Sequence, residues 1–285
     1  MGNWAAMTAE GSFPVEPAET AGDKEFHVGE TRVILLESVA STQDELRRLA
    51  ILAPGTALCI VAQEQTAGRG RSGREWVAQR GAALLLSFLA TPAPASVQMT
   101  PLAAGVAAAE TLAEFGCPVR LKWPNDLIAA PDGARCKLGG ILCEQDAGLP
   151  GKVLVGIGIN LLAEAAPPGL PATSVAAVAG RAPSQEELLC ALLPRLQRWC
   201  SLPPSSIRKG WLSWQTGLGE SVTVVMGKRT IVGEALGIDE AGALLVREGD
   251  VTVTCPAGDV HLQQSPRHAQ KKAGDAEETP MPKTI

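Results

Sequence analysis

The segment QEQTAGRGRSGREW, at 63–76, places three arginines among three glycines within seven residues. Its glycines fit the pattern G-x-G-x-x-G, which in dinucleotide-binding proteins opens a helix and precedes an acidic residue by about twenty positions. Here the pattern leads through a turn into the apolar segment 82–90, and Phe88 and Leu89 stand where the acidic residue is required. The sequence therefore disfavours a dinucleotide site.

The arginines of this loop, Arg69, Arg71 and Arg74, indicate a different ligand chemistry. Glycines let backbone N–H groups come close to an anion, and guanidinium groups add paired donors that neutralise carboxylate or phosphate. Three cations in one loop suit a site where several anionic groups are brought together against their mutual repulsion. The alternative, a solvated basic turn, is disfavoured because the loop directly follows a strand of buried type at 57–65.

Three further polar or glycine-rich segments occur at the ends of predicted strands. They are KWPND at 122–126, Lys137 with the glycines that follow it, and GIGIN at 156–160. Each is weak evidence alone, because a lysine at a strand end is usually solvated. Strand ends share a rim of the sheet where binding sites form, so we expect the three segments to meet the arginine loop in one site.

The elements that position these segments follow from the apolar patterns. The predicted strands are 33–38, 57–65, 83–90, 119–123, 137–145 and 152–160. Thr42 and Glu45 predict a capping box at the start of one helix, an alanine-rich helix follows at 100–115, and Ser184 with Glu187 opens another. Strands with interspersed helices predict an α+β fold, a mixed β-sheet with helices on one face.

Downstream of Gly217 the sequence changes to short β runs separated by Gly and Asp about every ten residues, which is typical of a small all-β barrel. The two ends of the chain are rich in Ala, Glu and Pro without periodicity and predict disorder. We therefore expect a disordered N-terminal segment at 1–28, a main domain at 29–217, a small barrel at 218–264 and a disordered tail at 265–285.

Composition limits the classes of partner. A formal net charge of −5 argues against a protein that coats nucleic acid. The seven cysteines contain no C-x-x-C and no metal-type spacing, so they predict reduced thiols and no metal site. The N-terminus lacks the features of a secretory signal, and the longest apolar run is too short to cross a bilayer. We expect a soluble, cytoplasmic protein with no membrane partner.

Taken together, the motifs resemble those of the biotin–protein ligases. GRGRSGREW is similar to the biotin and adenylate loop of that family, and KWPND, KLGGIL and VGIGINL match its other signature segments in the same order. GIDEAGALLV fits the family's C-terminal SH3-like β-barrel. The resemblance covers about 38–263 and implies a biotin/lipoate ligase-like catalytic domain at 29–217. It indicates the ligase-only type, without an N-terminal DNA-binding domain.

The resemblance implies an activity in two steps. Biotin's carboxylate reacts with ATP, supplied with Mg²⁺, to give biotinyl-5′-AMP and pyrophosphate. A lysine of a biotin carboxyl carrier protein domain then attacks this mixed anhydride. The family works as a monomer or homodimer and needs no covalent enzyme nucleophile.

The resemblance also implies site residues, carried over position by position. The expected catalytic residues are Arg71, Lys122, Asp126 and Lys137. The expected biotin-binding residues are Ser41, Thr42, Gln43, Gln65, Arg69, Gly70, Arg71 and Lys137. The expected ATP- and adenylate-binding residues are Arg69, Arg74, Trp76, Asn125, Gly156, Gly158 and Asn160. Gln43 departs from the family's usual Asn, and the loop after Asn160 offers no aromatic residue to cover adenine.

Three other functions fit parts of the pattern. A lipoate or octanoate protein ligase or transferase shares the catalytic fold but is not expected to combine GRGRSGR with a C-terminal barrel. A transcriptional regulator that binds biotinyl-adenylate needs a DNA-reading domain, for which 1–28 is too short. A biotin-binding module without catalysis has no need of Lys122, Asp126 and three loop arginines.

Overall fold

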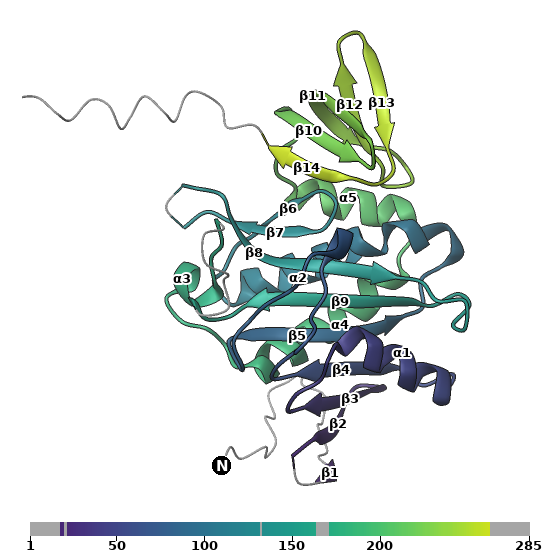
Figure 1. Ribbon diagram of the computed structural model, residues 1–285, viewed down its shortest axis with the longest axis vertical. Helices are drawn as coiled ribbons and strands as arrows, with labels where there is room; N and C mark the ends of the chain where they lie inside the picture. The colour runs from purple at the N-terminus through teal and green to yellow at the C-terminus, as the bar shows by residue number, and fades with distance from the viewer. Residues whose placement is uncertain (1–17, 20–21, 132, 164–170, 263–285) are drawn as a thin grey trace, which may run out of the picture.

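The computed structural model describes residues 18–19, 22–131, 133–163 and 171–262. A nine-stranded sheet forms its centre, with the spatial order β1-β2-β3-β4-β5-β9-β8-β7-β6 (Figure 1). The strands are β1 Ala18–Glu19, β2 Lys24–Val28, β3 Thr31–Leu36, β4 Leu58–Ala62, β5 Ala83–Ala90, β6 Arg120–Lys122, β7 Asp126–Ala129, β8 Cys136–Glu144 and β9 Val153–Asn160. Only the pairing of β3 with β4 is parallel among the described strands. The sheet is therefore mixed, as expected.

In the described part of the chain, two helices lie between strands of the large sheet in sequence, and three follow one another after its last strand. They are α1 Thr42–Leu52, α2 Thr100–Glu114, α3 Val175–Ala179, α4 Gln185–Ser201 and α5 Pro204–Trp214, with the 3₁₀ turns η1 Arg71–Gly73 and η2 Pro94–Met99. The capping box predicted for α4 is confirmed: Ser184 accepts the N–H of Glu187, and Glu187 accepts the N–H of Ser184. The α+β class is confirmed.

The two faces of the sheet carry different helices. Residues of α2, α4 and α5 pack with the strands in one large core, which includes Leu112, Leu192 and Trp211. Leu46 and Ala50 of α1 instead pack in a separate cluster on Leu58, Ile60, Leu89 and Leu154. Because successive residues of a strand face opposite sides, α1 lies on the other face from α2 and α4 (Figure 1). The expected single helical face is correct for α2, α4 and α5 and wrong for α1.

The face that carries α1 is lined by small residues where β5, β9 and β8 run side by side. Ser87 of β5 stands opposite Gly156 of β9, and Gly158 of β9 stands opposite Gly140 of β8. Large side chains at these positions would fill the space above the strands. Their absence leaves a trough that the N-terminus of α1 and the arginine loop occupy.

A second, antiparallel sheet follows α5. Its strands are β10 Ser221–Met226, β11 Arg229–Ile238, β12 Leu244–Glu248, β13 Val251–Cys255 and β14 Asp259–Leu262, in the order β13-β12-β11-β10-β14. This agrees with the predicted SH3-like module, here a five-stranded sheet without a described pairing of β13 with β14.

The C-terminal module is joined to the main domain by polar and apolar contacts. The indole N–H of Trp123 donates to the carbonyl of Gly242 at 2.9 Å, and Arg208 Nε donates to the carbonyl of Ile238 at 2.9 Å. Core residues of both parts, such as Val224 and Leu112, belong to one cluster. The module therefore lies firmly against the end of the sheet above α5 (Figure 1).

The predicted boundary at the N-terminal end differs from the structure, and most of both predicted disordered segments lies outside the described residues. Lys24–Val28 form β2 and pair with β3, so the sheet begins inside the segment 1–28 that the sequence predicted to be disordered. Residues 1–17 and the tail 263–285 lie outside the described part of the chain. No helix in the described part has the length and apolarity that crossing a bilayer requires.

Candidate active site

The arginine loop leaves β4 and folds back on itself as a narrow hairpin over the trough. Trp76 N donates to the carbonyl of Gly68 at 2.9 Å, and Gly70 N donates to the carbonyl of Arg74 at 2.7 Å. A Cβ on Gly68 would lie 2.4 Å from the carbonyl oxygen of Trp76, so this position requires glycine. Gly70 has φ −109°, so its glycine does not serve a left-handed turn, and a Cβ there would lie 3.4 Å from the carbonyl oxygen of Arg74, an ordinary contact.

Trp76 covers the glycine pair at the floor of the trough. A Cβ on Gly158 would lie 2.4 Å from the indole ring, and one on Gly140 would lie 3.3 Å from it. The Lys137 ammonium is 6.0 Å from the centroid of the ring. The indole Nε1 is buried and has no hydrogen-bond partner among the described residues.

Lys122, Asp126 and Lys137 form an ion-pair cluster beside this ring. The carboxylate of Asp126 forms two ion pairs: Oδ2 lies 2.8 Å from Lys122 Nζ, and Oδ1 lies 2.6 Å from Lys137 Nζ. Burial alone would raise the pKa of Asp126, but the charges and hydrogen bonds of the two lysines outweigh it and lower the pKa below its usual range. The carboxylate therefore stays ionised and holds two cations together.

Arg71 reaches from the loop to this cluster and to the C-terminal module. One guanidinium nitrogen donates to Asn125 Oδ1 at 3.1 Å, and another donates to the carbonyl of Gly258 at 3.2 Å. Arg74 Nη2 lies 2.7 Å from Asp259 Oδ1, and Arg71 lies 3.8 Å from the same oxygen. Asp259 thus contacts two of the predicted site residues but was not itself predicted, because nothing in an acid of a barrel strand points to a loop so far away in the chain.

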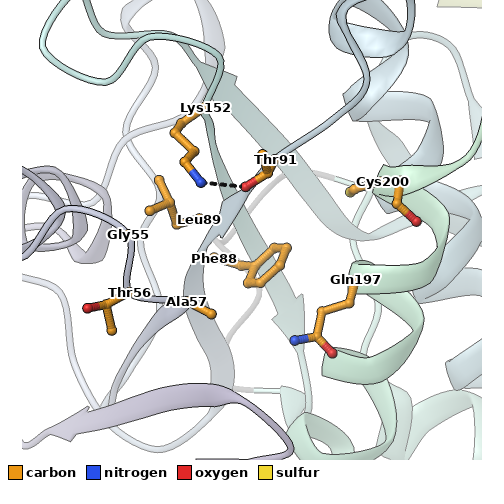
Figure 2. A pocket seen from close by; sticks show the side chains of 10 residues that line it. Gly55, Thr56, Ala57, Phe88, Leu89, Thr91, Lys152, Gln197 and Cys200 are labelled. Atoms are coloured by element: carbon orange, nitrogen blue, oxygen red, sulfur yellow. Dashed lines mark hydrogen bonds between the residues drawn. The ribbon is translucent and has the colours of Figure 1, made fainter.

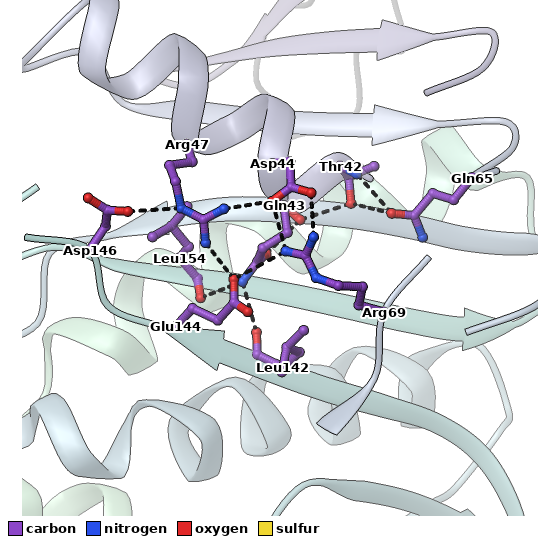
Figure 3. A network of polar contacts seen from close by, with 11 residues as sticks. Thr42, Gln43, Asp44, Arg47, Gln65, Arg69, Leu142, Glu144, Asp146 and Leu154 are labelled. Atoms are coloured by element: carbon purple, nitrogen blue, oxygen red, sulfur yellow. Dashed lines mark hydrogen bonds and ion pairs between the residues drawn. The ribbon is translucent and has the colours of Figure 1, made fainter. Parts of the chain in front are cut away.

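Arg69 turns toward the acidic residues around α1 instead (Figure 3). Its guanidinium makes a two-point contact with Asp44 and lies 3.6 Å from Glu144. Arg47 binds the same acids and Asp146. The hydrogen bonds from Arg69 are the main cause that lowers the pKa of Asp44. Arg69 thus tethers the loop to α1, while Arg71 and Arg74 extend in the opposite direction.

The start of α1 supplies the deepest polar groups of the trough. Ser41, Thr42 and Gln43 are buried. Gln65 Oε1 accepts two hydrogen bonds from Thr42, one from its backbone N–H at 2.8 Å and one from its hydroxyl at 3.0 Å. Thr42 does not form the predicted capping box, because its hydroxyl faces Gln65 and Ser87 while Ser41 occupies the N-cap position without a side-chain cap bond.

Gln43, the departure from the family pattern, is held entirely by protein groups. Its Nε2 donates to the carbonyl of Leu154 at 3.1 Å and lies 3.4 Å from that of Leu142, and its Oε1 accepts the hydroxyl of Ser87 at 2.8 Å. A Cβ on Gly156 would lie 2.9 Å from Gln43 Oε1. Gly156 therefore makes room for Gln43, although the sequence analysis expected it near the adenylate.

Asn160 closes the trough at the end of β9. It is buried, and its Nδ2 donates to the carbonyl of Thr173 at 3.1 Å. Residues 171–173 run along β8, with Lys137 N bonded to the carbonyl of Pro171 and Thr173 N bonded to that of Lys137, both at 2.9 Å. Asn160 thus anchors the return of the loop after β9, and 164–170 of that loop lie outside the described residues.

Every predicted site residue consequently lies in or around one trough, and the arginines divide between its two ends. A cavity of about 260 Å³ lies elsewhere, near the other end of β5, lined by Phe88, Lys152 and Gln197 among others (Figure 2). Lys152 Nζ there donates to Thr91 Oγ1 at 2.7 Å. None of the predicted site residues lines this cavity.

This arrangement is similar to that of known proteins. Residues 35–160 match the Biotin/lipoate A/B protein ligase family, and residues 217–262 match the Biotin protein ligase C terminal domain. The biotin–[acetyl-CoA-carboxylase] ligase of Paracoccus denitrificans is 36% identical over 252 residues, which cover 79% of this chain and 98% of that protein.

Solved structures agree. The biotin protein ligase from Aquifex aeolicus in complex with biotin and ATP matches with a TM-score of 0.68 and 30% identity, covering 82% of this chain and 99% of that one. The biotin protein ligase from Leishmania major in complex with biotinyl-5-AMP matches with a TM-score of 0.58 and 26% identity, covering 82% and 98%.

Proposed function

This chain belongs to the biotin protein ligase family, and on that premise we propose that it attaches biotin to a lysine of a biotin carboxyl carrier protein through biotinyl-5′-AMP. The observation that carries the proposal is the pairing of Lys122 and Lys137 with the partly buried carboxylate of Asp126, while Arg71 binds the neighbouring Asn125, directly beside the trough. A small ligand with a carboxylate tail can lie in the trough and extend that tail to the cations.

In the first step a carboxylate oxygen of biotin attacks the α-phosphorus of ATP. The new oxygen–phosphorus bond forms while the bond to the β-phosphate oxygen breaks, and pyrophosphate leaves. The step forces a carboxylate against a polyphosphate, so fixed cations stabilise the transition state. We assign this role to Arg71, Lys122 and Lys137, with Arg74 near the departing phosphates. We propose that Mg²⁺ enters bound to ATP and keeps part of its water shell.

In the second step the neutral amine of the carrier lysine attacks the carbonyl carbon of the anhydride, and AMP leaves with the electrons of the carbon–oxygen bond. The lowered pKa of Asp126 makes it a weak base. We therefore assign Asp126 to orienting the amine and holding the two lysines, and the amine's proton leaves to solvent.

The remaining residues of the trough divide between the two substrates in this proposal. Biotin's head group lies over the trough among Ser41, Thr42, Gln43, Gln65 and the backbone at Gly70. The adenylate lies toward Trp76, Asn125 and Gly158. Arg69, held by Asp44, fixes the loop above biotin.

The experiment is direct. The chain is incubated with biotin, MgATP and a carrier domain, and mass spectrometry follows the carrier. We expect the carrier's mass to rise by one biotin, and no rise with a carrier whose target lysine is replaced by arginine. Lipoate replaces biotin in a parallel reaction; modification by lipoate and not by biotin would contradict the proposal and favour a lipoate ligase.

A further inference from the structure

The cavity of about 260 Å³ lies at the end of β5 that points away from the arginine loop, and none of the motifs reaches it (Figure 2). It is bounded by the residues before β4, the end of β5, the residue before β9 and the last turn of α4. Ligand sites in proteins commonly begin at about 300 Å³. A space of this size therefore suits a small molecule.

The lining of the cavity combines apolar and polar side chains. Phe88, Leu89 and Ala57 supply apolar surface. Lys152 Nζ donates to Thr91 Oγ1 at 2.7 Å, and Figure 2 shows this pair and the ring of Phe88 on the lining of the same space. The lining suits a ligand with a short apolar body and one polar end.

The charge of the lining is positive. Lys152 is the one charged residue among the described residues that line the cavity. The thiol of Cys200 also belongs to the lining, but burial raises its pKa to about 12, so it stays neutral at physiological pH. The cavity thus carries a single positive charge.

Lys152 differs from the other partly buried cations of the described chain. Those that form ion pairs are Arg32, Arg47, Arg71, Lys122, Lys137 and Arg195. Arg208 instead donates to the carbonyl of Ile238. Lys152 binds the neutral hydroxyl of Thr91 and has no carboxylate within ion-pair distance among the described residues. A partly buried ammonium without a counter-ion favours an anion that can reach it.

We propose that this cavity is a second ligand site, which binds a small monocarboxylate with a short apolar body. One carboxylate oxygen accepts from the ammonium of Lys152. The hydroxyl of Thr91 accepts from Lys152, so its own hydrogen can be donated to the second oxygen. The apolar body packs on Phe88 and Leu89. A monoanion matches the single charge, whereas a phosphate dianion would leave one charge without a partner.

The test is a titration of the full chain with hexanoate, followed by NMR of the methyl groups. Biotin is present at saturation, because the trough is itself proposed to take a carboxylate on an aliphatic tail. We expect saturable shifts at Ala57, Leu89 and Thr91, with a Kd on the order of 1 mM for a ligand of so few atoms. Hexan-1-ol and hexylammonium have the same chain without the negative charge and should bind at least about tenfold more weakly.

Two variants separate the charge from the apolar surface. Lys152→Gln should weaken hexanoate about tenfold and leave hexan-1-ol unchanged, since only the ion pair is lost. Ala57→Leu places a larger side chain in the cavity and should weaken both probes. Lys209→Gln is the matched control, because Lys209 is exposed on α5 and does not line the cavity. Thermal melting checks that each variant is folded, and Lys152→Gln alone suffices if Ala57→Leu is not.

Several outcomes would overturn the site. They are shifts that rise linearly without saturation, equal binding of the three probes, and unchanged hexanoate binding in Lys152→Gln. Hexanoate that binds only in the absence of biotin lies in the trough, which would also overturn it. The titration repeated without biotin still tests the site if the chain does not bind biotin, and the carrier assay tests the proposed function separately.

Discussion

Single residues of this site act through charges and shapes that can be removed one at a time. Asp126 is 14% exposed and faces two ammonium groups, so removal of its charge leaves both lysines without their shared carboxylate. The indole ring of Trp76 occupies the space that a side chain at position 158 would fill, so this position requires glycine. Both features predict measurable effects.

Asp126→Asn should lower the free energy of unfolding at pH 7 by roughly 2 kcal/mol, because it leaves Lys122 and Lys137 without their shared carboxylate. The pKa of Asp126 is lowered in the folded state, so its contribution is present above the ordinary carboxyl pKa and is lost as the pH falls toward the folded value. The difference between wild type and variant should therefore shrink in acid.

Urea denaturation at neutral and acidic pH measures this difference. Asp250→Asn is the matched control, since Asp250 is exposed and has no ion pair among the described residues. If the difference in the free energy of unfolding between wild type and Asp126→Asn stays constant down to strongly acidic pH, the carboxylate does not interact with the lysines.

Gly158→Ala should displace the indole of Trp76, because the added Cβ lies 2.4 Å from the ring. A shift of about 1 Å in a site of this kind can reduce the rate on the order of 100-fold, and we expect the formation of biotinyl-AMP to fall by that amount. Pyrophosphate release measures it. Gly237→Ala is the control, since nothing lies within 4 Å of its added Cβ, and normal rates in both variants would contradict the assignment of Trp76.

At the scale of elements, the site depends on the loop between β4 and β5 being tied at both ends. Arg69 binds α1 through Asp44, and Arg71 and Arg74 bind the start of β14 through Gly258 and Asp259. These ties join the loop to two separate parts of the fold. A loop fixed at two ends presents its guanidinium groups in one arrangement before the substrates arrive.

Asp259→Ala should release Arg74 and loosen Arg71 without disturbing the biotin end of the trough. We expect the KM for ATP to rise about tenfold, which corresponds to the free energy of about one charge-assisted hydrogen bond. The affinity for biotin should stay near that of wild type. Steady-state kinetics with each substrate varied in turn would measure both. Asp250→Ala in the same module should leave both constants unchanged, and a selective loss of biotin affinity in Asp259→Ala would contradict the assignment.

Sequence patterns predicted those elements whose signals are local. The strands that became β3, β4, β5, β8 and β9 carry continuous apolar runs, and the capping box at Ser184 is complete within four residues. β7 was missed because its four residues begin at the last residue of the turn KWPND, and β2 because its charged residues resemble the segment before it. Short strands such as β2 and β7 gain their stability from the strands on either side, which a local pattern does not reveal.

The residues of the candidate site show the same division between local sequence signals and contacts with distant parts of the chain. Residues within motifs were predicted, whereas Ser87, Asp44 and Asp259 were not. Each of these three acts on a residue at least 25 positions away in the chain. The alternation of β5 gives Ser87 its place on the α1 face, but only the structure shows that Thr42 and Gln43 lie above it. The face chosen by α1 likewise depends on packing with distant strands.

At the scale of the whole molecule, the main domain and the C-terminal module share one apolar core. Val222, Val224 and Ile231 of the module belong to the same cluster as the residues of α2 and α4. Trp123 of KWPND is bonded to Gly242 in the turn between β11 and β12. The module is therefore part of the body that carries the site.

Calorimetric melting of the full chain should give a single cooperative transition, because two units with a common core unfold together. A chain ended after residue 217 should be strongly destabilised, since it exposes the apolar surface that the module covers. Two well-separated transitions in the full chain, or a truncated chain with normal melting, would contradict the shared core.

The contact of Arg71 with Gly258 joins residues 187 positions apart, and that of Arg74 with Asp259 joins residues 185 apart. The contacts among Thr42, Gln43, Gln65 and Ser87 need nothing beyond residue 154. Since a chain is synthesised from its N-terminus, the residues of the two ends of the site become available in a fixed order. Every residue that makes the contacts at the start of α1 has been synthesised by position 154, whereas the arginines on the nucleotide side of the proposed site receive their last anchor only when the final strand has been made.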